Sequence, residues 1–241
     1  MNNREYISLS IMGLIVFSAF SGQIKWAGPY EILGDAGVRQ NGELLYAYSG
    51  SGENATVNGV AFKGAKGTRA WDDAITMEFA SVDSKNFGAQ IPTSDKRSAS
   101  MKAMLQGAPW CDNKPVTVTL KRLLAGKAYL VQVWVNDSRK IAADRTAKLD
   151  DGKVVLYFNK RREGTCGTYA LGVFVADNSA EQSFVLQGNQ SSQLNAIQVR
   201  TIEAADVKLD LAGEVIATRP VGGVVKPKTQ DKSYSIVDVK E

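Results

Sequence analysis

Two alternating segments within residues 116–135 constrain the fold most strongly. Val116, Val118 and Leu120 alternate with threonines, which is the period of a half-buried β-strand. Gly126 then supplies the backbone freedom of a tight connection. The next run places apolar side chains on one face and polar or aromatic side chains on the other. The apolar face holds Tyr129, Val131, Val133 and Val135, and the other face holds Gln132, Trp134 and Asn136. This stretch predicts a central β-hairpin.

Similar alternation recurs along most of the chain, interrupted by turn signals such as Asn41-Gly42 and Asn58-Gly59. The turn signals return every eight to twelve residues or so, which is typical of an antiparallel β-sandwich or barrel. Residues 98–106 differ, because Met101, Met104 and Leu105 follow a helical period after Ser98, which predicts one short capped helix. Strands do not alternate with long helices, so a parallel α/β sheet is disfavoured.

The two ends of the sequence differ from this core. Residues 1–21 resemble an export signal, since a mostly apolar run from Ile7 to Phe20 ends near the small residues Ala19 and Ser21. The alternatives are an uncleaved anchor or a buried N-terminal strand. We expect residues 22–203 to form the sandwich. Residues 204–241 would form a hairpin and then a linker or tail, with a β-prone stretch at residues 234–239 that could pair with a sheet edge.

Composition limits the chemistry. The chain has no histidine, which removes Ser-His-Asp and Cys-His nucleophiles and every zinc site that requires imidazole. The 29 basic and 25 acidic residues leave a net charge of only +4, which argues against nucleic acid as a partner. Residues 160–162, Lys-Arg-Arg at a predicted hairpin tip, are best explained as a solvated turn. The alternative is a basic patch for an anionic polysaccharide.

Cys111 and Cys166 are the only two cysteines. In an exported chain two cysteines most often pair, so we predict a disulfide between them. The alternative is two buried, unlinked thiols.

Four residues at the end of the second strand of the hairpin form a candidate carbohydrate site: Trp134, Asn136, Asp137 and Arg139. A flat apolar ring beside amide, carboxylate and guanidinium groups is what a sugar site uses. The structural alternative is favoured: Trp134 belongs to the core, and Asp137 pairs with Arg139 or Arg145 to hold a loop.

Two other tryptophans are candidate ligand platforms. Trp71, followed by Asp72, and Trp110 are expected in loops, where the alternative is that each packs against the sandwich edge. Asp35, Asp72 and Asp73 are candidate ligands for a structural Ca²⁺, which binds carboxylate and carbonyl oxygens. Their spacing does not match an EF-hand loop, so the calcium signal is weak.

The order of short phrases resembles exported β-sandwich domains of planctomycete- and verrucomicrobia-type bacteria. The phrases are Ile24-Lys25-Trp26-Ala27, Ile32-Leu33-Gly34-Asp35 and residues 43–48, 56–62, 129–139, 145–147, 188–189 and 192–200. The resemblance implies a galactose-binding-domain-like jelly roll, similar to carbohydrate-binding modules, with its first and last strands in one sheet. The two cysteines and the long basic tail depart from that pattern.

The fold expectation is therefore an all-β antiparallel sandwich of jelly-roll type, with one short helix and a C-terminal extension. The leading functional expectation is a non-catalytic carbohydrate-binding module that is exported to the periplasm, the cell surface or the medium. The alternative is a structural or assembly subunit that engages a protein partner, or another copy, through residues 204–241. A glycosidase built on two carboxylates ranks third.

Overall fold

The computed structural model describes residues 22–88, 90–94, 96–159, 165–203, 207–209 and 215–217. The predicted signal segment, the basic residues 160–162 and most of the C-terminal extension lie outside these residues. No helix of the described part is long and apolar enough to cross a membrane.

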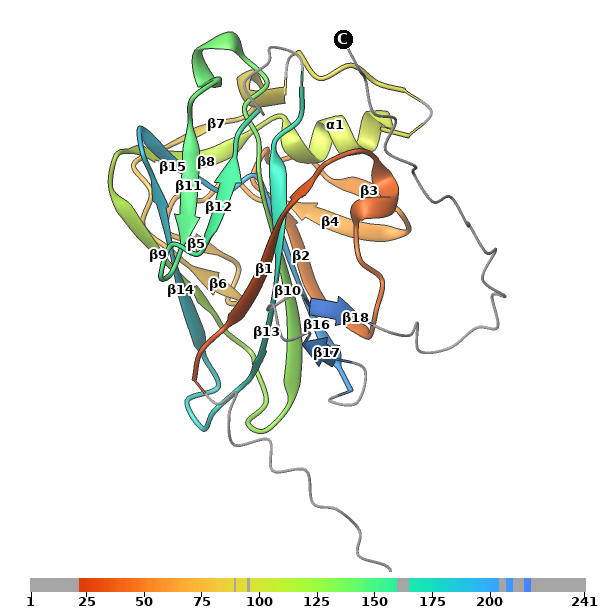
Figure 1. Ribbon diagram of the computed structural model, residues 1–241, viewed down its shortest axis with the longest axis vertical. Helices are drawn as coiled ribbons and strands as arrows, with labels where there is room; N and C mark the ends of the chain where they lie inside the picture. The colour runs from red at the N-terminus through yellow and green to blue at the C-terminus, as the bar shows by residue number, and fades with distance from the viewer. Residues whose placement is uncertain are drawn as a thin grey trace, which may run out of the picture.

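Two large β-sheets form a sandwich (Figure 1). The first has seven strands in the order β1-β13-β10-β16-β2-β4-β3. Their bounds are β1 Lys25–Glu31, β13 Thr168–Val175, β10 Ala128–Val135, β16 Ala196–Ile202, β2 Glu43–Ser49, β4 Val60–Gly64 and β3 Ala55–Val57. All of these pairs are antiparallel except β2 with β4.

The second large sheet has six strands in the order β12-β11-β14-β9-β6-β5. Their bounds are β12 Val154–Tyr157, β11 Thr146–Leu149, β14 Gln182–Gly188, β9 Pro115–Leu120, β6 Ile75–Thr76 and β5 Ala70–Trp71. Every pair in this sheet is antiparallel. The all-β antiparallel sandwich predicted from the alternation is therefore confirmed, and the first strand, β1, shares a sheet with β16, as the resemblance implied.

Smaller elements complete the described part of the chain. A three-stranded sheet contains β15 Ser191–Gln193, β8 Ala108–Asp112 and β7 Ser81–Asp83. Three short 3₁₀ turns are η1 Asp35–Gly37, η2 Asn86–Gly88 and η3 Lys140–Ala142. The hairpin predicted after the sandwich is present as β17 Val207–Leu209 with β18 Val215–Ala217.

The predicted helix is α1, Ala99–Leu105. The Ser98 side chain accepts a hydrogen bond from the backbone N–H of Met101 at 3.0 Å, which confirms the expected cap. Met101, Met104 and Leu105 are buried on the face that the helical period predicted.

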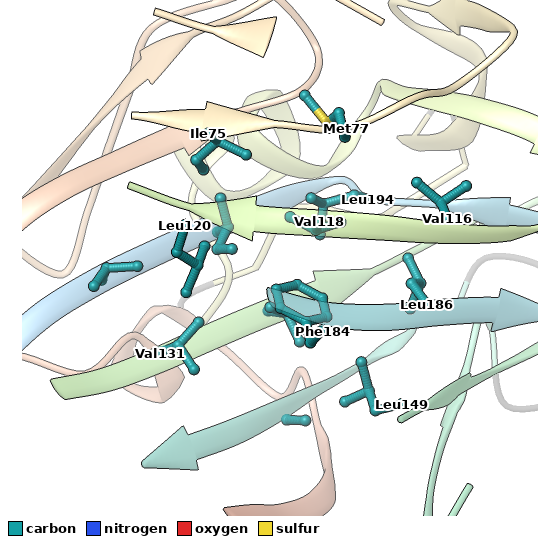
Figure 2. Close-up of a cluster of buried hydrophobic side chains, with 14 of the residues drawn as sticks. Ile75, Met77, Val116, Val118, Leu120, Val131, Leu149, Phe184, Leu186 and Leu194 are labelled. Atoms are coloured by element: carbon teal, nitrogen blue, oxygen red, sulfur yellow. The ribbon is translucent and has the colours of Figure 1, made fainter. Parts of the chain in front are cut away.

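The seven-stranded sheet is covered on both faces. One face packs against the six-stranded sheet and forms the inter-sheet core, which holds Val131, Val118, Leu186 and Phe184 among others (Figure 2). The opposite face forms an outer core with α1, which holds Trp134, Phe62, Tyr169 and Met104 among others. Both faces of β10 are therefore buried, and this explains why Trp134 and Gln132 are inaccessible to solvent.

The disulfide prediction is wrong. Cys111 lies in the inter-sheet core and Cys166 lies in the outer core, and both thiols are free and buried. The Sγ atom of Cys166 instead accepts a hydrogen bond from Arg97 Nη1 at 3.1 Å. Spacing along the chain gave no information about which of the two cores each cysteine enters.

Candidate functional site

The three tryptophan candidates are not exposed loop platforms. Trp134 is 1% exposed and packs edge-on against Phe62, with ring centroids 5.7 Å apart. Trp71 is also 1% exposed, and its indole N–H donates to the carbonyl of Gly67 at 3.0 Å. Trp110 lies within strand β8 and is half-buried. The prediction of loop positions for Trp71 and Trp110 is wrong, and the structural alternative holds for Trp134.

The three aspartates proposed as calcium ligands have other partners. Asp72 lies 2.9 Å from Lys63 Nζ and accepts a hydrogen bond from the Tyr48 hydroxyl, and these contacts hold the pKa of Asp72 below its ordinary value. Asp73 faces Arg122 at 3.5 Å. Asp35 Oδ1 accepts from the backbone N–H of Ser98, just before α1. Within the described ranges, no three acidic or cysteine side chains come together as a metal site.

Asn136 forms the centre of a buried amide hub with Gln193 and Asn195. The Asn136 side chain donates to the carbonyls of Phe87 and Leu105 at 2.9 and 3.4 Å, and its oxygen accepts from the backbone N–H of Gly167 at 2.9 Å. Its own backbone N–H donates to Asn195 Oδ1 at 2.7 Å. All these side-chain groups of Asn136 are used inside the protein, so Asn136 cannot present them to a ligand.

The other half of the amide hub comes from the β15–β16 connection. Gln193 Nε2 and Asn195 Nδ2 both donate to the carbonyl of Asn136, at 2.6 and 3.0 Å. Asn195 Nδ2 also donates to the carbonyl of Leu105 at 2.9 Å. The amide hub therefore joins the end of β10 to the end of α1, and it brings five segments of the chain together, around Phe87, Leu105, Asn136, Gly167 and residues 193–195.

One residue further on, Asp137 forms an arginine cluster with Arg139 and Arg145. The Asp137 side chain is fully buried and binds Arg139 with two hydrogen bonds, at 2.8 Å from Nε and 2.7 Å from Nη2. Arg145 Nη1 reaches the same carboxylate at 3.3 Å. The loop interpretation of Asp137 is confirmed, with both arginines as partners rather than one.

The two residues that follow β12, Phe158 and Asn159, hold the loop of the arginine cluster in place. The backbone N–H of Asp137 donates to the carbonyl of Phe158, and Asn159 Nδ2 donates to the carbonyl of Arg139 at 2.7 Å. The Arg139 guanidinium also lies over the Phe87 ring, 4.9 Å from its centroid. The hydrogen bonds from Arg139 to Asp137 raise the pKa of Arg139 above its ordinary value. Guanidinium groups stay protonated in proteins, so both arginines of the cluster carry a full charge.

The arginine cluster has two guanidinium groups around one buried carboxylate, and the charge of Asp83 also acts on Arg139. Two guanidinium groups share one buried Asp137, and their side chains are 33% and 18% exposed. Arg145 Nε is buried and has no hydrogen-bond partner in the described part of the chain. A guanidinium presents planar pairs of N–H donors that match carboxylate, sulfate and phosphate oxygens. The arginine cluster is therefore suited to hold an anionic group.

A second candidate lies on the six-stranded sheet. An open groove of about 720 Å³ separates residues 76–80 from residues 114–119, and we call it the β6–β9 groove. Its sides carry the exposed residues Glu78, Lys114 and Thr117, and Met77 and Cys111 are buried along it. Burial raises the pKa of the Cys111 thiol above its ordinary value. The sequence gives no signal for this groove, because it depends on where two neighbouring strands separate.

Comparison with known proteins assigns no family to this chain. A scan against protein-family models found no match, and a search of curated proteins found no significant relative.

Proposed function

We propose that this chain is a non-catalytic binding module of an exported or cell-surface protein, and that it binds an acidic glycan at the arginine cluster. The observation that carries the proposal is that the partly exposed Arg139 and Arg145 side chains meet at one buried carboxylate, Asp137, with the charge of Asp83 also acting on Arg139. The galactose-binding-domain-like resemblance supports a carbohydrate rather than another anion.

An acidic glycan suits this cluster better than a neutral one. Of the rings expected as platforms for a neutral sugar, Trp71 and Trp134 are both 1% exposed, and Trp110 is half-buried within β8. At the cluster, the Arg139 and Arg145 side chains remain 33% and 18% exposed, and guanidinium groups bind carboxylate or sulfate with two parallel hydrogen bonds. Charge-assisted bonds of this kind weaken with added salt when they are partly exposed.

The test is binding of the full chain to three immobilised oligosaccharide probes of equal length: a galacturonate oligomer, a sulfated galactan and neutral galactan. We expect binding to one or both acidic probes, weakened by salt, and little to the neutral probe. Arg139→Gln and Arg145→Gln should each reduce affinity about tenfold or more, because each removes a charge-assisted contact. Arg122→Gln is the matched control, since Arg122 pairs with Asp73 at a separate exposed position. Failure to bind either acidic probe, or binding that both substitutions leave intact, would contradict the proposal.

The second candidate function is a structural or assembly subunit that contacts a partner through residues 204–241. The two functions use different residues, so one chain can carry both. A glycosidase would in addition hydrolyse one of the probes, and we expect no hydrolysis.

A further inference from the structure

The two arginines of the arginine cluster meet at one oxygen of Asp137. Arg139 binds the carboxylate along one side of its guanidinium, with Nε 2.8 Å from Oδ1 and Nη2 2.7 Å from Oδ2. Arg145 Nη1 reaches the same Oδ2 at 3.3 Å. The two guanidinium groups are therefore joined through one buried oxygen, and each has further N–H groups that Asp137 does not use.

One edge of the Arg139 guanidinium stays open. A guanidinium can bind a carboxylate along its side, formed by Nε and Nη2, or along its end, formed by Nη1 and Nη2. Asp137 takes the side of Arg139, and Nη1 makes no hydrogen bond within the described ranges. In these two guanidiniums only Arg145 Nε is both buried and without a partner there, so Arg139 Nη1 reaches solvent. The end edge of Arg139 is accordingly left for a ligand.

Asp83 does not occupy this end edge. Its negative charge acts on Arg139, but its carboxylate is bonded within its own turn. Oδ1 accepts from the backbone N–H groups of Lys85 and Asn86 at 3.0 and 2.8 Å, and Oδ2 accepts from the Asn86 side chain at 2.8 Å. Since like charges repel, Asp83 favours a singly charged ligand group over a dianion such as a phosphate monoester.

Phe87 fixes the plane in which a ligand group would bind. Its ring is 3% exposed and lies under one face of the Arg139 guanidinium, 4.9 Å from the centroid. The Phe87 carbonyl accepts hydrogen bonds from Asn136 Nδ2, Ser138 N and Ser138 Oγ, at 2.9, 2.7 and 3.0 Å, so this residue is firmly held. A flat carboxylate binds in the guanidinium plane, whereas a tetrahedral sulfate also places oxygen on the side of the ring, whose face is partly negative.

We propose that the end edge of Arg139 binds the carboxylate of a uronate residue, with Arg145 supplying a second positive charge, and that the arginine cluster selects uronates over sulfated sugars. This inference rests on the proposed function, and it narrows the ligand from acidic glycans in general to those with free carboxylates. Asp137 and Phe87 already hold the guanidinium in place. Arg139 therefore loses little conformational freedom when a ligand binds.

The test titrates the full chain with a galacturonate oligomer, its methyl ester, and a sulfated galactan of the same length and charge as the galacturonate. We expect galacturonate to bind about tenfold more tightly than the sulfated galactan, since one charge-assisted hydrogen bond is worth about that factor. The methyl ester, which has no free carboxylate, should not bind.

Arg139→Lys separates the paired donors of the end edge from the charge, because lysine keeps the charge but has no planar fork. This substitution should weaken galacturonate binding about tenfold and sulfated galactan binding about threefold or less. Arg122→Lys is the matched control, since Arg122 pairs with Asp73 at a separate exposed position, and it should change neither affinity.

The outcomes distinguish this inference from the proposed function. No binding of either acidic probe would overturn both. Equal or tighter binding of the sulfated galactan would overturn the uronate assignment alone, and so would binding of the methyl ester. Equal losses for both probes in Arg139→Lys would show that Arg139 acts only as a point charge, which overturns the end-edge assignment. If Arg139→Lys fails to fold, the parent chain's two affinities and the methyl ester still decide between uronate and sulfate.

Discussion

Two polar clusters lie one residue apart at the end of β10, and they differ in how far their side chains reach solvent. Gln193 Oε1 in the amide hub and Arg145 Nε in the arginine cluster are both buried without a hydrogen-bond partner among the described residues. In the amide hub, the Asn136 side chain donates to two carbonyls and accepts from one N–H, all inside the protein. In the arginine cluster, Asp137 is fully engaged but its two arginine partners remain partly exposed, and Arg145 Nε lacks a partner in the described part of the chain. The first cluster stabilises loops, and the second keeps part of two arginine side chains at the surface, where a ligand can reach them.

This difference follows from how deeply the side chains of the two clusters are buried. The Asn136 side chain lies between Phe87, Leu105 and Gly167, where unpaired polar groups are costly, so each group needs a protein partner. Arginine side chains are long enough to pair with a buried carboxylate while part of the guanidinium reaches solvent. Neighbouring residues can therefore have separate roles, although their chemistry suits one site.

The largest effect should come from the amide hub. Asn136→Ala removes one acceptor and two donors, and it leaves the backbone N–H of Gly167 buried without its partner. We expect the free energy of unfolding to fall by about 3 kcal/mol, measured by urea titration. Asn189→Ala is the matched control, because the Asn189 side chain also bridges backbone groups, at Thr146 and Asp144, but is exposed. The control should lose under about 1 kcal/mol. Equal losses in the two variants would mean that burial does not distinguish the clusters.

The sequence correctly predicted the alternation of β10, but it did not predict that the second face of β10, which carries Trp134, is buried as well. Tyr129, Val131, Val133 and Val135 all lie in the inter-sheet core, as the period of two requires. A polar or aromatic face normally suggests solvent or ligand, yet α1 and the surrounding loops cover it and bury Trp134. Periodicity assigns residues to faces, and only the tertiary structure determines which faces become covered.

Sequence patterns within one element predicted the structure better than expected pairings between distant residues, because such pairings depend on the tertiary structure. The Ser98 cap and the spacing of Met101, Met104 and Leu105 lie within one helix, so the sequence contains all the information they need. The partners of Cys111 and Cys166 depend on which core each residue enters. The groove depends on the separation of residues 77–80 from β9, which no local pattern records. In the arginine cluster, by contrast, all three residues lie within ten positions of each other, and the sequence already suggested their pairing.

A smaller effect is expected at the carboxylate that joins the arginines. Asp137→Asn keeps the shape of the side chain but leaves Arg139 and Arg145 without their counter-charge. We expect a loss of about 2 kcal/mol in the free energy of unfolding, less than for a fully buried ion pair because both guanidiniums reach solvent. Asp72→Asn is the control, since its partner Lys63 has a 63% exposed side chain, and it should change stability little. A change at Asp137 no larger than the control would show that this carboxylate does not hold the loop.

The smallest effect on stability should come from Arg145, and this prediction separates the two clusters most sharply. Arg145→Gln leaves Asp137 bound by both hydrogen bonds from Arg139, and it removes a guanidinium that is itself incompletely bonded. We expect a loss of under about 1 kcal/mol in the free energy of unfolding, measured by the same titration beside Arg122→Gln, whose pair with Asp73 is exposed. A loss of the size expected for Asn136→Ala would place Arg145 in the structural framework with the amide hub. Its guanidinium would then be committed to the fold and would not be available to an acidic ligand.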